Sequence, residues 1–294
     1  MFDSTRSDKI FQVINYAFLG FILLIVLYPL VFVLSASLSS PELLLKGEVW
    51  LLPKGLSFDS YARVFSNKDI LTGYLNTIKY TIIGTAINVL MTIAAAYPLS
   101  RRDFVGRGVL TVFMVFTMFF SGGLIPTFIL VRDLGMYNSM WALILPSAVS
   151  VWNVSIMRTF FQTSVPFEIQ EAAMIDGCSN IGILVRIVLP LSLPIILVMI
   201  MFYSVSHWNS FFSALIYLTD RAKYPLQVIL REILIQDHMG EMIDTFDEGI
   251  IRQMLLAEGL KYAVVVVANL PVLMIYPFIQ KYFIKGMTLG GLKG

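Results

Sequence analysis

Residues 171–190 read EAAMIDGCSNIGILVRIVLP and lie between the fourth and fifth of six long stretches that carry no charge. Just before them, Pro166 suits the first turn of a helix, because its missing N–H would have no partner there. Two glutamates then lie near the positive end of the helix dipole, and Gly177 can supply a left-handed stop. A second short helix over 181–188 leads into the fifth stretch. We expect two short helices at an angle to each other, forming a protruding knob.

The flanking stretches indicate a chain that lies in a lipid bilayer. Hydrophobic residues make up 57% of the sequence and charged residues 14%, whereas soluble domains carry about 25% charged residues; the mean hydropathy is +0.80. Each uncharged stretch has at least 19 residues, and a helix needs about 20 to cross a hydrocarbon core of roughly 30 Å. Helices also satisfy their own backbone groups in lipid. The sequence therefore predicts an all-α integral membrane protein with six transmembrane helices, at 12–34, 77–98, 109–131, 138–158, 190–212 and 262–283.

An alternative interpretation of the first stretch is a cleaved signal peptide. Arg6 and Lys9 precede it, and Ser35-Ala36-Ser37 is similar to a small-residue cleavage site. However, the uncharged run Ile10–Pro41 is much longer than the roughly 7–15 residues of a signal peptide's apolar region. We therefore expect this stretch to remain as a membrane anchor.

Basic residues divide unequally between the two sides of the six predicted helices. The side with both termini and the loops 99–108 and 159–189 has ten basic and six acidic residues, a net charge of +4, and the other side has −2. An excess of Lys and Arg in short loops marks the cytoplasm, so we expect both termini and the 171–190 segment to be cytoplasmic. The predicted organisation is a cytoplasmic segment 1–11, a transmembrane domain 12–283 with outer loops at about 35–76 and 213–261, and a cytoplasmic tail 284–294.

The 171–190 segment resembles the EAA loop in the permease subunits of binding-protein-dependent ABC importers. That pattern is Glu-Ala-Ala, three residues, Gly, nine residues, Ile, one residue and Leu-Pro, and an ordinary amphipathic loop would not explain a complete match. The matching residues are Glu171, Ala172, Ala173, Gly177, Ile187, Leu189 and Pro190. The resemblance implies the type I ABC importer (MetI-like) architecture, in which a coupling helix within the cytoplasmic loop 166–190 docks on a separate ATPase.

The resemblance also implies roles and partners. Glu171 would pair with a basic residue of the ATPase, Ala172 and Ala173 would form the packing surface, and Asp176-Gly177 would form the turn. The chain lacks the phosphate-binding pattern GxxxxGK[ST] that such a transporter needs. ATP and Mg²⁺ would therefore be used by the partner, and this chain would bind no cofactor. The implied partners are a second permease subunit, two ATP-binding cassette subunits and an extracytoplasmic substrate-binding protein, all at a bacterial cytoplasmic (inner) membrane.

The end of the chain is similar to the tail of MalG-like subunits in the carbohydrate branch of this family. Residues 286–294 read GMTLGGLKG, and in that family the tail reaches between the two ATPase subunits. The resemblance implies contacts with them from Thr288, Gly290, Gly291 and Lys293; the alternative is a basic tail near anionic lipid. The whole chain resembles the LplC/YtcP-like permeases. This implies an importer of complex oligosaccharides, and we expect alginate oligosaccharides or related uronate-containing sugars as the cargo.

Candidate residues of the substrate path lie near the outer halves of the predicted spans. Aromatic faces can stack on sugar rings, and amides can bond to sugar hydroxyls. The candidates are Trp152, Asn153, Tyr203, Trp208 and Asn209. The alternative is that the aromatic residues mark the membrane interface and the amides join helices. In the outer loop 213–261, apolar residues recur at helical spacing between 226 and 234 and predict a helix. The family resemblance implies a docking surface for the binding protein there, and the alternative is a helix on the membrane surface or a cap on the bundle.

Other classes of function lack the residues that they need. No nucleophile or zinc-protease motif is present. Two histidines and the single Cys178 do not suggest a metal site, and a net charge of +2 gives no basic stripe for nucleic acid. The remaining alternative is an ion-gradient-driven secondary transporter of a small polar solute. It is disfavoured because no charged residue lies deep in a predicted span and no inverted repeat is evident. We therefore predict a transport subunit that is not itself an enzyme.

Overall fold

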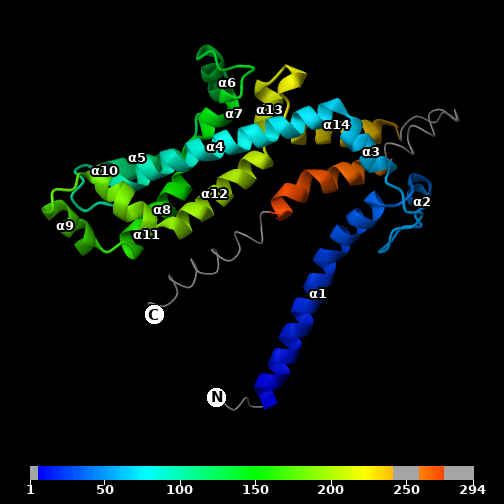
Figure 1. Ribbon diagram of the computed structural model, residues 1–294, viewed down its shortest axis with the longest axis horizontal. Coiled ribbons are helices and arrows are strands. Elements are labelled where there is room, and N and C mark those ends of the chain that lie inside the picture. The colour runs from blue at the N-terminus through cyan, green and yellow to red at the C-terminus, as the bar shows by residue number, and fades with distance from the viewer. Residues whose placement is uncertain (1–5, 241–257, 275–294) are drawn as a thin grey trace. The chain divides into compact units, whose positions relative to one another are not determined.

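The computed structural model describes the backbone of residues 6–240 and 258–274 (Figure 1). Every regular element within these residues is a helix, so the predicted all-α class is confirmed. The chain divides into two compact units. The first comprises Met1–Ile70 and Leu230–Leu270, and the second comprises Leu71–Ile229 and Pro271–Gly294.

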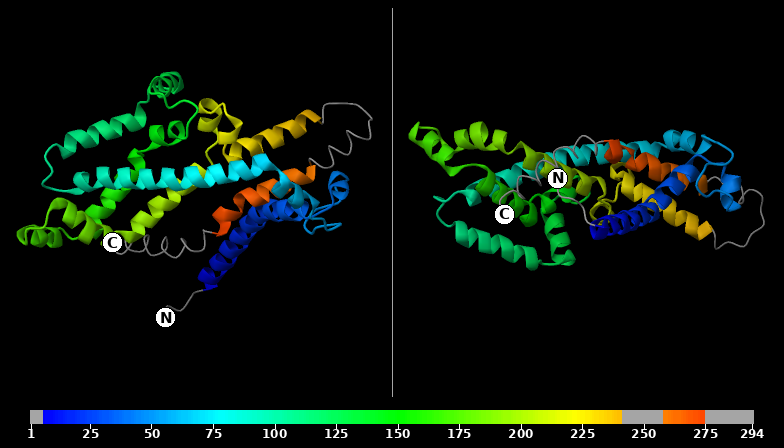
Figure 2. Two further views of the ribbon diagram at one scale, coloured as in Figure 1. Left: turned by 45° about the horizontal axis from the view of Figure 1, so that its top comes forward. Right: turned by 90° about the horizontal axis from the view of Figure 1, so that it is seen from below.

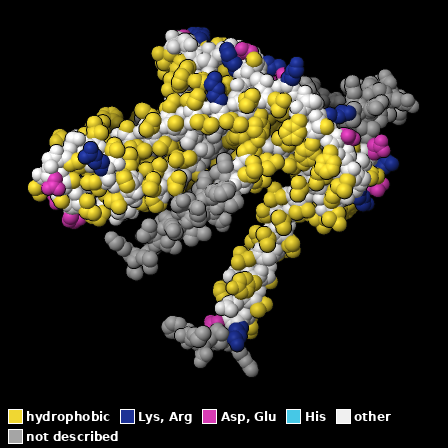
Figure 3. Space-filling model, in the orientation of Figure 1, with side chains coloured by type: hydrophobic (Ala, Val, Ile, Leu, Met, Phe, Trp, Pro, Cys, Tyr) yellow, Lys and Arg dark blue, Asp and Glu magenta, His cyan; other side chains and the backbone are white. Residues whose placement is uncertain are grey.

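In the first unit, helix α1 (Arg6–Ser37) is a candidate membrane span. Its most apolar 18-residue window has a mean hydropathy of 2.8. At 1.5 Å per residue, its 32 residues extend about 48 Å, more than the thickness of a hydrocarbon core. Large apolar side chains are exposed on all its faces, and Figure 3 shows them along the face of α1 that is turned to the viewer. A helix that is apolar all round suits contact with lipid or with other membrane helices.

Small residues at the end of α1 attach it to the segment that follows. The Ser35 hydroxyl donates a 2.6 Å hydrogen bond to the Leu51 carbonyl, and Ala36 and Ser37 are fully buried. These three residues, which are similar to a cleavage site, have a packing role in this structure. The predicted outer loop 35–76 is therefore ordered, and it contains α2 (Pro41–Leu45), α3 (Asp59–Ser66) and the start of α4.

The second unit is built on the long helix α4 (Lys68–Ser100), the other continuous candidate span. Three pairs of helices, each sharply bent at a short break, follow it along the chain. In the first pair, α5 (Arg107–Phe119) and α6 (Leu124–Asp133) meet at 112°. In the second, the segment Trp141–Ser147, which contains α7 (Trp141–Ile144), meets α8 (Val151–Ser164) at 51°. In the third, Asn180–Leu191 meets α12 (Leu193–Trp208) at 83°. The later elements are α13 (Phe212–Tyr217), α14 (Leu226–Gly240), which continues into the first unit, and helical residues 258–274.

The prediction of one continuous helix over 109–131 is wrong. The chain leaves α5 after Phe119 and enters α6 at Leu124, with a bend of 112° between them. Gly123 lies at the break with φ of 88°, a conformation that glycine adopts without steric cost. The break carries no charge, so the pattern of charges does not distinguish it from a continuous apolar helix.

The count of six spans stays a prediction. Two described helices are long and apolar enough to cross a membrane, and there are up to five candidates if each bent pair forms one span. The fourth predicted span, 138–158, is interrupted before α8, and the fifth, 190–212, is described as α12 with α11 (Leu189–Leu191) before it. The sixth, 262–283, runs past residue 274 and lies partly outside the described residues.

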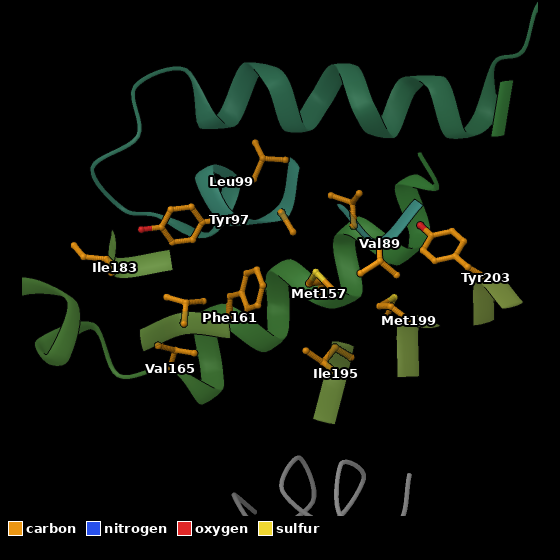
Figure 4. Packing of buried hydrophobic residues seen from close by; sticks show 13 residues of the cluster. Val89, Tyr97, Leu99, Met157, Phe161, Val165, Ile183, Ile195, Met199 and Tyr203 are labelled. Carbon is orange, nitrogen blue, oxygen red and sulfur yellow. The ribbon is translucent and has the colours of Figure 1, made fainter. Parts of the chain in front are cut away.

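The main core of the second unit lies where α4, α8 and α12 meet. Figure 4 shows Val89 of α4, Met157 and Phe161 of α8, and Met199 of α12 pointing toward one another. Met157 and Met199 are completely buried. Lipid tails are as apolar as these side chains, so close packing and hydrogen bonds, rather than burial from water, hold such helices together.

Polar pairs join α4 to α12 beside this core. The hydroxyls of Thr92 and Tyr203 are 2.7 Å apart, and His207 Nε2 lies 2.6 Å from Asn88 Oδ1. Asn88 also donates through Nδ2 to the Ser147 carbonyl at 2.6 Å. Since Asn88 Oδ1 can only accept, His207 must carry its proton on Nε2. Such bonds between membrane helices contribute about 0.6–2 kcal/mol each, and they fix the register of α4 against α12.

The helical spacing predicted between 226 and 234 is confirmed as α14. Leu226, Ile229 and Leu230 are buried, so this face packs within the protein. The Leu226 N–H donates to Thr77 Oγ1 of α4 at 2.8 Å. This supports the interpretation of a cap on the bundle for the start of the helix.

Candidate functional site

The EAA loop contains a short helix, α9 (Phe167–Ile175), that ends at a defined turn. Gly177 has φ of 80°, which confirms the predicted left-handed stop. The Gly177 N–H donates to the Met174 carbonyl at 3.0 Å, and the Cys178 N–H donates to Ala173 at 2.9 Å. These two bonds form a Schellman motif. Pro166 is the residue before the helix rather than its first residue, a shift of one position from the prediction.

The second arm of the loop runs from Asn180 to Leu191 without a break. Ser179 caps its start by accepting from the Gly182 N–H at 3.2 Å. Residues Leu184–Val188 form a π-helical turn just before Pro190, which has no N–H to continue a regular ladder. The arm comprises α10 (Asn180–Ile183), this turn and α11, and it ends at Ser192, where the chain bends by 83° into α12.

The motif residues of the EAA loop divide into an exposed set and a packed set. Glu171, Ala172 and Asp176 are exposed. Ala173 and Ile187 are half-buried and pack against the main core. The packed positions hold both arms to the bundle and leave the carboxylates free to meet a partner.

Two isoleucines at the tip of the loop were not predicted as site residues. Ile175, at the end of α9, is 87% exposed, and Ile181, near the start of the second arm, is 74% exposed. Both isoleucines lie close to the Asp-Gly turn in the sequence, which marks them as candidates for the surface of the loop. Their exposure could not be predicted, because it depends on how the loop folds.

The loop rests on the C-terminal end of α4, through Arg101. The Arg101 side chain is 5% exposed. It donates from Nε and Nη2 to the two Asp103 carboxylate oxygens, both at 2.9 Å, and from Nη1 to Gln170 Oε1 of α9 at 3.0 Å. Nη2 also lies 3.2 Å from the Met174 sulfur. In the sequence Arg101 served only as a marker of topology, and its contacts with α9 could not be predicted.

The second arm is attached to the same end of α4. The Tyr97 hydroxyl donates to the Asn180 carbonyl at 3.1 Å. Figure 4 shows Tyr97 of α4 directed toward Ile183 of this arm, and Ile183 is completely buried. Both views of Figure 2 place residues 167–191 beside the C-terminal end of α4. Both arms of the loop therefore contact one helix that is distant in sequence.

The ion pair at Arg101 makes Asp103 a stronger acid. The hydrogen bonds from Arg101 hold the pKa of Asp103 below its usual range, and the same bonds raise the pKa of Arg101. A carboxyl group with a lowered folded-state pKa contributes stability above its unfolded pKa of about 3.9. That contribution is lost as the pH falls through the folded-state value.

We expect Asp103→Asn to be less stable than the wild type by a constant amount between pH 7 and about 5. The difference should shrink only below about pH 4, where Asp103 itself becomes protonated. Thermal denaturation of both proteins in detergent at a series of pH values measures the difference. A difference that closes between pH 7 and 5 would contradict the ion pair described here.

The five candidates for the substrate path occupy different environments. Tyr203 and Trp208 are buried on α12, where Tyr203 bonds to Thr92 and the Trp208 ring meets Tyr74 edge-on at 5.7 Å. Asn209 donates back to the Val205 carbonyl of its own helix. Trp152 is exposed and Asn153 is buried. The structure brings Tyr203 and Trp208 together with α4, and their role in transport stays a prediction.

A cavity of about 760 Å³ lies between α4 and α12 and is also lined by Pro271 and Val272. Its walls are mainly aliphatic. The exceptions are the side chains of Thr81, Thr85, Ser204 and Trp208. Within the described residues, no group of three or more His, Cys, Asp or Glu side chains lies close enough to hold a metal ion.

The predicted contacts of the C-terminal tail lie outside the described residues. They are Thr288, Gly290, Gly291 and Lys293. Their contact with an ATPase therefore stays a prediction.

Comparisons with known proteins agree with this architecture. The family described as binding-protein-dependent transport system inner membrane component matches residues 87–289. The polygalacturonan/rhamnogalacturonan transport system permease protein YtcP of Bacillus subtilis (strain 168) is 43% identical over 293 residues, covering 98% of this chain and 100% of the relative. Protein LplC of the same organism is 40% identical over 292 residues, covering 99% and 97%.

One solved structure has the same fold over nearly all of the chain. It is a crystal structure of a bacterial ABC transporter involved in the import of the acidic polysaccharide alginate. The matching chain is 33% identical with a TM-score of 0.87, and the match covers 96% of this chain and 100% of that chain. The chain therefore belongs to the family of binding-protein-dependent transport system inner membrane components, and it is a permease subunit of an ABC importer.

Proposed function

We propose that this chain is a permease subunit of an ATP-driven importer of oligosaccharides and forms half of the translocation path with a second permease. The observation that carries the proposal is the full-length likeness to sugar permeases, 43% over 98% of the chain for YtcP, together with a complete EAA pattern on an exposed loop. The implied assembly adds two ATP-binding cassette subunits and an extracytoplasmic binding protein. ATP and Mg²⁺ are bound by the ATPase subunits.

The EAA loop is the proposed contact with the ATPase. Its exposed set offers carboxylates at Glu171 and Asp176 for charge pairing. The exposed Ile175 and Ile181 at the tip of the loop add aliphatic side chains for packing. Its packed set ties it to the bundle, so movement of the ATPase would carry the loop and its helices as a lever. The charge imbalance of the loops supports a cytoplasmic position for it.

The proposed cargo is an oligosaccharide with acidic sugar units. YtcP is named for polygalacturonan and rhamnogalacturonan, and the transporter of the solved structure imports alginate, an acidic polysaccharide. We propose alginate oligosaccharides or related uronate-containing sugars for this chain. The candidate sugar contacts remain Tyr203 and Trp208 on α12, Asn209 directly after it, and Trp152 and Asn153 on α8.

Purification of this chain from its own bacterium tests the proposed function. An ABC permease should bring ATPase subunits and a second permease with it in mild detergent. The complex in liposomes should hydrolyse ATP faster when its binding protein is loaded with a uronate oligosaccharide than with a neutral one. A chain that purifies alone and moves solute with an ion gradient would instead support a secondary transporter.

A further inference from the structure

We propose that Arg101 is a positioning residue that locks α9 to the end of α4, so that α4 transmits the movement of the EAA loop. The inference rests on the proposed function, because it assigns the route by which a docked ATPase would move the bundle. Helices α8 and α12 adjoin the loop in the chain, whereas 66 residues separate the end of α4 from the start of α9.

The Arg101 guanidinium is held on all its nitrogens. Nε and Nη2 meet Asp103, Nη1 meets Gln170, and Nη2 also approaches the Met174 sulfur. The planar group also lies 6.0 Å from the centroid of the Phe167 ring. The guanidinium group is bonded to Asp103 on one side and contacts three residues of α9 on the other. Because the group is planar and held at every nitrogen, α9 has little freedom to rotate against the end of α4.

Helix α4 then connects the loop to α12 through one polar face. Thr85, Asn88 and Thr92 are spaced three and four residues apart, so they lie on the same side of α4. They meet Ser204, His207 and Tyr203 of α12 at 3.3, 2.6 and 2.7 Å, respectively. Together with the Tyr97 contact to the second arm, these bonds make α4 a continuous link between the EAA loop and the middle of the bundle.

The neighbouring Arg102 provides a matched control. It carries the same charge and lies 5.2 Å from the centroid of the same Phe167 ring, but its side chain is exposed. A loss of basic charge or of a cation–π contact would therefore affect both residues. Of the two arginines, only Arg101 is buried and donates a hydrogen bond to α9.

The test uses the complete complex in liposomes with Arg101→Ala, Arg101→Lys, Gln170→Leu and Arg102→Ala. We expect Arg101→Ala to keep its ATPase subunits, because the exposed docking face is unchanged, and to move about tenfold less sugar per ATP hydrolysed. Arg101→Lys should not restore coupling, since a lysine ammonium cannot make the paired, planar hydrogen bonds of a guanidinium group. Gln170→Leu removes only the acceptor on α9 and should lower coupling in a complex that assembles normally. Arg102→Ala should match the wild type.

The double variant Arg101→Ala with Gln170→Leu should be no worse than Arg101→Ala alone, because both remove the same contact. Wild-type coupling in both Arg101→Ala and Gln170→Leu, or an equal loss in Arg102→Ala, would overturn the inference while the proposed function stands. A wild-type chain that purifies without any ATPase would instead overturn the proposed function and the inference with it.

Discussion

A permease carrying Glu171→Lys is expected to reach the membrane normally and to lose import almost completely. Glu171 is exposed on α9, and substitutions at such positions change stability by only about 0.5 kcal/mol. The Schellman turn at Gly177 uses backbone groups that the substitution leaves in place. The fold of the loop should therefore survive, and the loss should fall on the contact with the ATPase.

The size of the effect follows from reversing a charge at a docking surface. Removing one partner of a buried charge pair costs about 2–5 kcal/mol, which corresponds to a loss of affinity of roughly 30-fold or more. Substrate-stimulated ATP hydrolysis and co-purification of the ATPase with the variant measure this loss. The reconstituted variant should hydrolyse ATP at a rate that no longer responds to the loaded binding protein.

Glu168→Lys is the matched control. It makes the same change of charge on an exposed residue of the same helix, one turn earlier and outside the EAA pattern. It should cost only the interaction with the helix dipole, about 0.3–1 kcal/mol. Equal losses in both variants would indicate that the net charge of the loop matters rather than a pair at Glu171. Unchanged stimulated hydrolysis in Glu171→Lys would refute the proposed role.

Features that depend on neighbouring residues in the chain could be predicted from the sequence. The uncharged stretches correctly predicted the helices α1 and α4, because a helix that crosses lipid needs a minimum length of apolar residues. Gly177 ended α9 as expected, because a left-handed stop is a property of one residue and its nearest carbonyls. The division of the EAA loop into two arms follows from the same local chemistry.

Features that depend on contacts between distant residues could not be predicted. Arg101 and Gln170 are 69 residues apart, and nothing in the local sequence distinguishes Arg101 from Arg102. The bend at Gly123 was missed for a different reason, because glycine is uncharged and does not interrupt an apolar run. Charge and hydropathy indicate that a segment lies in lipid, but they do not indicate where its backbone turns.

The second large effect is expected at Gly84, where α4 packs against His207 of α12. A Cβ atom at Gly84 would lie 2.5 Å from His207 Nε2 and 2.6 Å from its Cε1 atom. The ring cannot move aside freely, because Nε2 donates to Asn88 Oδ1, and Asn88 in turn holds the Ser147 carbonyl. Gly84→Val should therefore separate the two helices or break this chain of hydrogen bonds.

We expect Gly84→Val to lose about 1–3 kcal/mol of stability, the usual cost of overpacking. Each kcal/mol lowers the melting temperature by about 2–4 °C in a domain of this size, and the fraction of protein that stays monodisperse after heating in detergent measures the loss. Gly20→Val is the control, because it makes the same change within helix α1 with no atom within 4 Å of the new Cβ.

A second substitution separates crowding from a general intolerance of valine in α4. Adding His207→Ala to Gly84→Val removes the ring that the new side chain would strike, so part of the lost stability should return. The recovery should be incomplete, because Asn88 then loses its hydrogen-bond partner. Wild-type heat resistance in Gly84→Val, or an equal loss in Gly20→Val, would mean that α4 and α12 do not pack as closely as described. Import should fall together with stability, because the face of α4 that meets His207 is the one proposed to carry movement from the EAA loop.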